Sequence, residues 1–217
     1  MKSTFFDFVK IRDRLMPNAN GFSSPEATRQ RLLETATALF AEKGYAAASV
    51  REIVSRAGFS KPVLYYYFKS KEGLFYAIMD WAANTQQLVL NQIFEAGGST
   101  EDRLRYFFNR VYEGIRQYKS LYLLIHGLIF GPPQAVPVYD FGRFQRQMLQ
   151  AVERILTEGV SAGEIRDIDT EDGAFLVLGL LDFSSNMDLV LPEMVDPQRP
   201  ERLLRMAFQG LNRGNVK

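Results

Sequence analysis

The residues best suited to chemistry lie between Ser49 and Lys71, in the segment SVREIVSRAGFSKPVLYYYFKSK. Cations and hydroxyls are interspersed there with apolar side chains, a mixture that can contact the phosphates and base edges of DNA. Lys61 would start a helix, where its ammonium adds to the positive end of the helix dipole and can meet a phosphate or a guanine edge. A lysine at a helix start is more often simply solvated, so this feature alone does not decide the function.

The side chains after that lysine extend the same interpretation. Pro62 and Val63 present apolar surface that can touch a thymine methyl group. Tyr65, Tyr66 and Tyr67 are consecutive, and successive residues of a helix point about 100° apart. At least one of the three must therefore face solvent, where its hydroxyl can donate to a phosphate.

Two short helices must position these residues. Ser49 and Glu52 form a capping-box sequence, Gly58 ends the first helix, and Ser60 is placed to cap the second. A small core can form from Leu39, Phe40, Ile53, Val54, Ala57, Leu64 and Phe68. This is a helix-turn-helix arrangement, whose second helix can lie in the major groove of DNA. The same geometry also occurs in proteins that never touch DNA.

The rest of the chain is predicted to be helical as well. Hydrophobic residues recur at helical spacing, no alternating stretch is long enough for a sheet, and prolines mark a loop near residues 131–137. Ser24 and Thr170 are the expected N-caps of two of the longer helices. The fold class is therefore all-α, with about nine helices: an N-terminal three-helix unit that contains the helix-turn-helix, followed by a C-terminal helical part.

Composition removes several kinds of function. The 217 residues include no Cys and one His, His126, so thiolate zinc sites, cysteine nucleophiles and multi-histidine metal centres are excluded. No glycine-rich phosphate loop is present. We expect no catalytic residue, cofactor or metal. No apolar run approaches the roughly 20 residues that span a bilayer and no signal peptide is evident, so we expect a soluble, cytoplasmic protein without a membrane partner.

The net charge of +1 hides an uneven distribution. Residues 1–71 contain 12 Lys and Arg against 6 Asp and Glu, a net of +6, whereas residues 72–217 contain 14 against 19, a net of −5. A basic N-terminal third is a possible phosphate-binding footprint. An uneven solvated surface explains the same numbers.

Residues 28–75 resemble the N-terminal domain of the TetR/AcrR family of bacterial transcriptional regulators. The shared features are the helix end LFAEKGY, the helix start SVREI, and the motifs AGFSK, LYYYF and SKEGLF. The departure is Pro62-Val63, where family members often have Gly or a small polar pair, so no operator sequence can be transferred.

The resemblance implies a homodimer that reads a palindromic double-stranded DNA operator and is controlled by a small molecule. It implies a ligand-responsive regulator, most often a repressor. Together with the residues themselves, it predicts DNA contacts at Ser49, Arg51, Ser60, Lys61, Pro62, Val63, Tyr65, Tyr66, Tyr67 and Lys71. It divides the chain into an arm (1–24), a helix-turn-helix domain (25–71) and a ligand-binding and dimerisation domain (72–217).

The C-terminal domain offers candidates for both of its expected roles. Ligand sites are often apolar cavities with few polar groups, and an apolar or aromatic effector is expected to contact Trp81, Asn84, Phe107, Tyr112, Tyr122, His126, Phe144, Phe183 and Asn186. Aromatic residues at helical spacing are more often plain core, and His126 is more often a hydrogen-bonded core histidine. The last two long helices would form a four-helix bundle with a second copy, through Phe175, Leu178, Leu181, Leu204, Phe208 and Leu211.

Three questions stay open at this level. Residues 1–15 are either a basic arm that adds DNA affinity or lie upstream of a true start at Met16. A protein-partner or scaffold module with a vestigial helix-turn-helix is an alternative to a regulator. A small all-α enzyme is a weaker alternative, because no converging catalytic residues can be identified.

Overall fold

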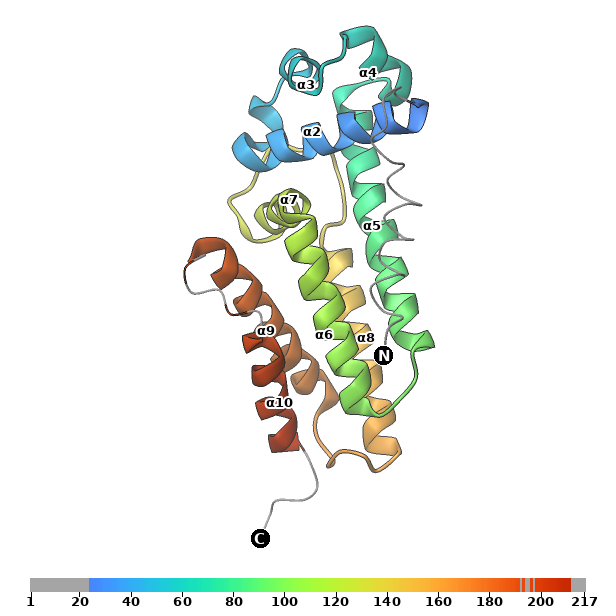
Figure 1. The fold of residues 1–217 in the computed structure, drawn as a ribbon, viewed down its shortest axis with the longest axis vertical. Helices are drawn as coiled ribbons and strands as arrows, with labels where there is room; N and C mark the ends of the chain where they lie inside the picture. The colour runs from blue at the N-terminus through green and yellow to red at the C-terminus, as the bar shows by residue number, and fades with distance from the viewer. Residues whose placement is uncertain (1–23, 192, 194–195, 197, 212–217) are drawn as a thin grey trace. The chain divides into compact units, whose positions relative to one another are not determined.

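The computed structural model describes residues 24–191, 193, 196 and 198–211, so most of the expected arm lies outside the described residues (Figure 1). Every regular element in the described part is helical. The described residues form nine helices, which are α2 (Pro25–Ala47), α3 (Val50–Ala57), α4 (Lys61–Phe68), α5 (Lys71–Glu95), α6 (Thr100–Gln117), α7 (Lys119–Phe130), α8 (Gly142–Ser161), α9 (Thr170–Val190) and α10 (Arg199–Leu211). The all-α prediction is confirmed.

Local chemistry explains where these helices begin and end. The Ser24 hydroxyl accepts a hydrogen bond from the Ala27 amide at 3.1 Å, as an N-cap should. Gly44 breaks α2 with φ 81°, a conformation that favours glycine. The cap expected at Thr170 is wrong by one residue: Asp169 caps α9, because its carboxylate reaches two amides of the first turn at 3.0 and 3.1 Å.

The chain divides into two compact units. One contains residues 24–81 and 123–139 of the described part, and the other contains residues 82–122 and most of the chain from 140 onwards. Helices α5 and α7 each contribute to both. The boundary expected after residue 71 falls at the first turn of α5, and as a division of function it stays a prediction.

The first unit is built on α2, α3 and α4, which pack against one another. Its buried side chains include those predicted for the helix-turn-helix core, together with Leu74, Phe75 and Ile78 from the start of α5. Burial of each large apolar side chain stabilises the fold by roughly 1.5–3 kcal/mol. The short helices therefore depend on this shared core rather than on their own propensity.

The second unit is a helical bundle of α6, α8, α9 and α10 with the second part of α5. Its core is apolar, and Phe107, Phe108 and Ile155 are fully buried. Two of its helices approach closely at Gly159 of α8, where an added Cβ atom would lie 2.2 Å from the Thr100 hydroxyl of α6. The Thr100 amide and hydroxyl both donate to the carboxylate of Glu164, at 2.6 and 2.7 Å.

Helix α9 is unusually apolar for a helix at the surface of its unit. By length and composition alone this helix could cross a membrane. Only a third of its most apolar stretch is buried within the described structure. The expectation that no apolar run approaches that length is therefore wrong. Core helices of soluble proteins pass the same test, so length and composition do not decide what covers α9.

Candidate nucleic-acid interface

The turn between α3 and α4 is set by one glycine. Gly58 adopts φ 77° and ψ 30°, the left-handed conformation that ends many helices. Its amide donates to the Ser55 carbonyl at 3.3 Å, and the next amide, of Phe59, donates to the Val54 carbonyl at 2.9 Å. These bonds use the free carbonyls at the end of α3 and turn the chain directly into α4.

The predicted core holds this turn in place. Ile53, Ala57 and Leu64 are fully buried, and Leu39 and Phe40 of α2 are 1% exposed. All three helices therefore share one apolar centre, as the sequence predicts. This fixes which side of α4 faces outward.

The outward side of α4 carries half of the ten predicted DNA contacts, and Val63 and Tyr67 of the same helix are half-buried. Ser60, Lys61 and Pro62 at its N-terminus are exposed, and Tyr65 and Tyr66 are 45% and 72% exposed. In helix-turn-helix proteins, residues near the N-terminus of the second helix face the base edges. The prediction that at least one tyrosine faces solvent is confirmed.

Two details of the caps differ from expectation. Ser60 occupies the N-cap position of α4, but its hydroxyl makes no capping hydrogen bond and is left exposed. At α3 the Ser49 hydroxyl accepts from the Glu52 amide at 3.2 Å, which is one half of the predicted capping box. The Glu52 carboxylate instead accepts a hydrogen bond from Lys43 of α2.

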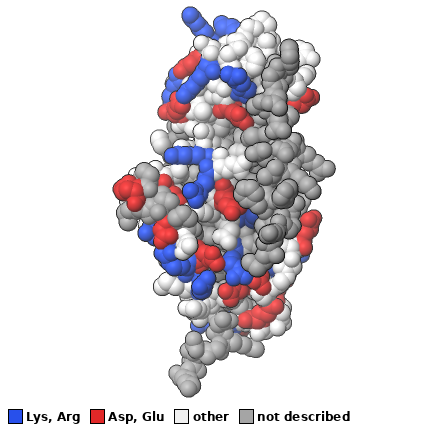
Figure 2. Space-filling model, viewed as in Figure 1, with Lys and Arg blue, Asp and Glu red and all other residues white. Residues whose placement is uncertain are grey.

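Most cations of the first unit are engaged with neighbouring groups. Arg56 donates to both oxygens of Glu42, at 2.7 and 2.9 Å, and this contact lowers the pKa of Glu42 and raises that of Arg56. Arg51 and Lys61 are exposed and make no ion pair with any described residue. Figure 2 shows Lys and Arg on the surface around α3 and α4, with acidic side chains between them.

Lys71 lies in a different environment from Lys61. Its ammonium is 4.2 Å from the centre of the Tyr45 ring and donates to the Ala46 carbonyl at 3.3 Å. Burial lowers the pKa of Lys71, while burial and nearby Glu72 raise the pKa of Tyr45. Tyr45 is not among the residues predicted from the sequence, although the motif GY at the break in α2 marks an aromatic residue at a helix end.

The residues predicted to bind a ligand do not form one cluster within either unit. Trp81 and His126 belong to the first unit, where the His126 ring lies 4.8 Å from that of Phe130. In the second unit Asn84 and Phe183 are exposed.

The remaining predicted ligand residues lie inside the second unit. Phe107, Tyr112 and Phe144 are buried, and Tyr122 lies 3.3 Å from Asn186. As ligand contacts, all nine residues stay predictions.

The residues predicted to form the dimer do not all face the same way in the protomer, and as dimer contacts they stay predictions. Leu181, Leu204 and Phe208 are at most 5% exposed because they pack into the core of their own chain. Phe175 is 56% exposed and Leu178 is half-buried, while the side chain of Leu211 lies outside the described residues. The apolar side chains that α9 and α10 leave exposed are Phe175, Leu176, Phe183, Val190 and Met206.

Comparison with known proteins agrees with this geometry. Residues 32–78, from α2 into α5, match the model of the family described as bacterial regulatory proteins, tetR family. The transcriptional repressor KstR2 of Mycolicibacterium smegmatis is 31% identical over 156 residues, which cover 69% of this chain and 73% of that protein. The chain belongs to the TetR family. It is a DNA-binding transcriptional regulator and not an enzyme.

Solved structures show the same fold over most of this TetR-family chain. The regulator FadR of Bacillus subtilis, in complex with stearoyl-CoA, has a TM-score of 0.64 and 18% identity over 84% of this chain and 99% of that one. A complex of SmeT with triclosan has a TM-score of 0.67 and 22% identity over 87% and 93%. At these identities the likeness concerns the fold alone.

Proposed function

We propose that this protein is a dimeric, cytoplasmic repressor that leaves a palindromic operator when a small molecule binds its C-terminal domain. The observation that carries the DNA-binding part is the outward side of α4, with Lys61 at the helix start and two exposed tyrosines. Because Lys61 makes no ion pair with any described residue, it can neutralise a phosphate or contact a guanine without first losing such a pair. The proposed contacts are the ten residues predicted from the sequence.

The ligand-responsive part rests on relatives and on the chemistry of the second unit. FadR and SmeT, which share its fold, are described with stearoyl-CoA and with triclosan, which each contain a large apolar part. The second unit of this chain is likewise rich in buried aromatic side chains. A small, largely apolar effector is the class that fits, and the KstR2 relative supports a repressor.

The dimer rests on the exposed apolar side chains of α9. Monomeric proteins rarely expose large apolar patches, and a two-fold axis lets one face cover its own copy. Two DNA-binding units in such a dimer would meet successive major grooves about 34 Å apart. Effector binding would favour a form of the dimer in which the distance between the two DNA-binding units no longer matches that between successive major grooves.

The test begins with selection of bound fragments from genomic DNA, because the operator is unknown. We expect enrichment of a palindrome near the protein's own gene. Lys61→Ala should then weaken operator binding about tenfold or more and reduce the slope of affinity against salt by about two, because each of the two copies loses one phosphate contact. Lys119→Ala removes the same charge from an exposed lysine at the start of α7 and serves as the matched control.

Two results would count against the proposal. If no palindrome is enriched and affinity is equally low for all DNA, the protein is a partner module rather than an operator-binding regulator. If Lys61→Ala keeps full helicity and unchanged operator affinity, α4 does not read DNA through this lysine.

A further inference from the structure

The exposed face of α9 carries Asp172 near the start of the helix and Asp182 among apolar side chains. Phe175, Leu176 and Phe183 are 56%, 46% and 64% exposed, and exposed Asp182 directly precedes Phe183. Gly179 lies between them along the helix, and a Cβ atom added there would meet no atom within 4 Å. In the proposed dimer this face is the surface that a second copy covers, so Asp182 would lose water when the dimer forms.

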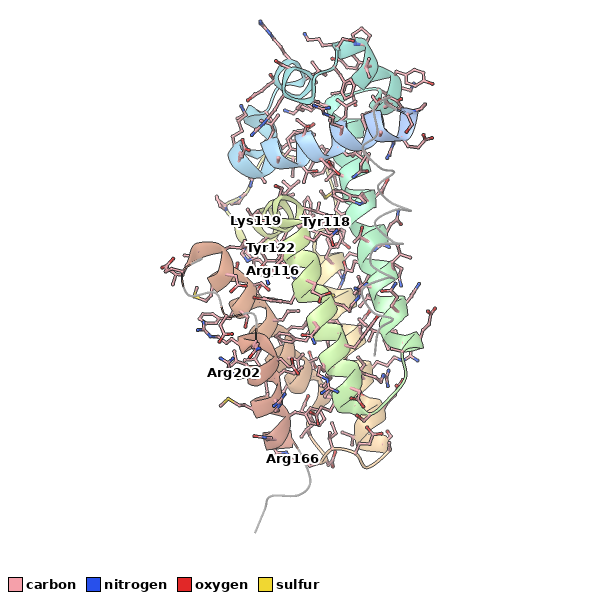
Figure 3. All side chains as sticks on the ribbon, in the orientation of Figure 1. Arg116, Tyr118, Lys119, Tyr122, Arg166 and Arg202 are labelled. Atoms are coloured by element: carbon pink, nitrogen blue, oxygen red, sulfur yellow. The ribbon has the colours of Figure 1, made fainter. Side chains whose placement is uncertain are left out.

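The same chain supplies hydrogen-bond donors to both oxygens of this carboxylate. The Tyr122 hydroxyl of α7 lies 3.2 Å from Asp182 Oδ1, and Asn186 Nδ2 donates to Oδ2 at 3.0 Å. Tyr122 also lies 3.3 Å from Asn186 Oδ1, but a hydroxyl has one proton and a carboxylate is the stronger acceptor. Figure 3 labels Tyr122 at the start of α7, beside α9.

The charge state of Tyr122 suits this role. Burial, and then the charge of Asp182, raise the pKa of Tyr122, so the phenol keeps its proton at neutral pH. A carboxylate that leaves water is strongly destabilising unless donors replace the lost hydration. We propose that Tyr122 is a positioning residue of the dimer face, which lets Asp182 be covered by a second copy by donating a hydrogen bond to it. This inference rests on the proposed dimer.

The position of Tyr122 in the chain gives this bond a regulatory consequence. It lies in the first turn of α7, and from Leu123 onwards α7 belongs to the compact unit that also contains the helix-turn-helix. Any movement of α7 that removes the hydroxyl from Asp182 would weaken the dimer. Dimerisation in turn favours the arrangement of α7 that makes the bond, because coupling between two equilibria is reciprocal.

The experiment measures the dimer dissociation constant of the full chain by sedimentation equilibrium. An unmet hydrogen bond to a charged group weakens association about tenfold or more, and a symmetric dimer contains two such sites. Tyr122→Phe is therefore expected to raise the dissociation constant about a hundredfold while the monomer stays folded, because water reaches Asp182 in the monomer. Operator binding should recover at protein concentrations above the new constant.

Two further variants separate this role from a general structural one. In an Asp182→Asn background the added Tyr122→Phe change should have little effect, since the charge that needs the donor is gone. Tyr112→Phe removes a similar phenol bond, to Asp188 of the same helix, but Tyr112 is 5% exposed within its own chain. It should lower the stability of the protomer and leave the dimer constant unchanged.

The outcomes distinguish the inference from the function on which it rests. A wild-type protein that stays monomeric at all concentrations overturns the proposed dimer and the inference together. A wild-type dimer that Tyr122→Phe does not weaken overturns the inference alone. Equal weakening by Tyr122→Phe with and without the Asp182 charge, or by Tyr112→Phe, also overturns it.

Discussion

Replacing Gly159 by alanine tests how closely α6 and α8 pack in the second unit. An alanine Cβ atom at this position would lie 2.2 Å from the Thr100 hydroxyl, 2.9 Å from its Cγ2 and 3.0 Å from its Cβ. Thr100 is 3% exposed, and both its amide and its hydroxyl donate to Glu164. The threonine therefore cannot turn away without losing a hydrogen bond to a carboxylate.

Opposing contributions to the free energy of unfolding decide whether Gly159→Ala stabilises or destabilises the protein. Glycine to alanine inside a helix normally stabilises by about 1 kcal/mol, because the unfolded chain loses freedom. Overpacking costs about 1–3 kcal/mol, and loss of the threonine hydroxyl bond costs about 1 kcal/mol more. We expect Gly159→Ala to destabilise the protein by about 1–3 kcal/mol, which lowers the melting temperature of a chain this long by roughly 2–4 °C per kcal/mol.

The assay is thermal and urea unfolding followed by circular dichroism. Gly114→Ala is the matched control, since Gly114 lies inside α6 and an added Cβ atom would meet nothing within 4 Å. It should stabilise the protein by up to about 1 kcal/mol. Adding Thr100→Ala to Gly159→Ala should recover part of the loss. If Gly159→Ala stabilises the protein as Gly114→Ala does, the close approach of α6 and α8 is refuted.

Two other predictions follow from caps and from a buried phenol. Ser49→Ala should cost about 1 kcal/mol in urea unfolding because the hydroxyl caps α3, whereas Ser60→Ala, which removes no cap bond, should leave stability unchanged; equal losses would contradict the assigned caps. Burial, then the hydrogen bond to Asp188, raise the pKa of Tyr112 from 10.0 to about 12. Between these values the unfolded chain releases a proton that the folded chain keeps, so stability should fall from pH 10 to about pH 12, by at most about 3 kcal/mol. Urea midpoints across this range should fall less steeply for Tyr112→Phe, and identical slopes would contradict the assignment.

The helix-turn-helix could be predicted almost completely from the sequence. Its helices are short, their apolar positions have a clear phase, and Gly44 and Gly58 mark breaks where positive φ is required. The outward side of α4 then follows from the buried positions of Leu64 and Phe68. Where the contacting residues are close in the chain, their spacing in the sequence largely determines how they are arranged in space.

The second unit could be predicted only in outline. Helix α9 is apolar on nearly every side, so its periodicity does not show whether Leu181 or Phe183 faces the core. The pairing of Tyr112 with Asp188 joins residues 76 apart in the chain, and no local pattern indicates it. The aspartates of α9 nevertheless indicate that such contacts exist, because a carboxylate in an apolar helix needs a hydrogen-bond partner.

The apolar character of α9 is better matched by a protein surface than by lipid. Asp182 and Asp188 both lie within the helix, and an aspartate near the centre of a bilayer costs about 2.5–3.5 kcal/mol. Both carboxylates accept hydrogen bonds from tyrosines of the same chain. Ala174 and Val177 on the buried side already pack into the core of the unit, so the described residues leave one side of α9 uncovered. A helix surrounded by lipid would not need one side that packs into the protein and another that is exposed. A helix that packs against both its own core and a second copy needs two such apolar sides.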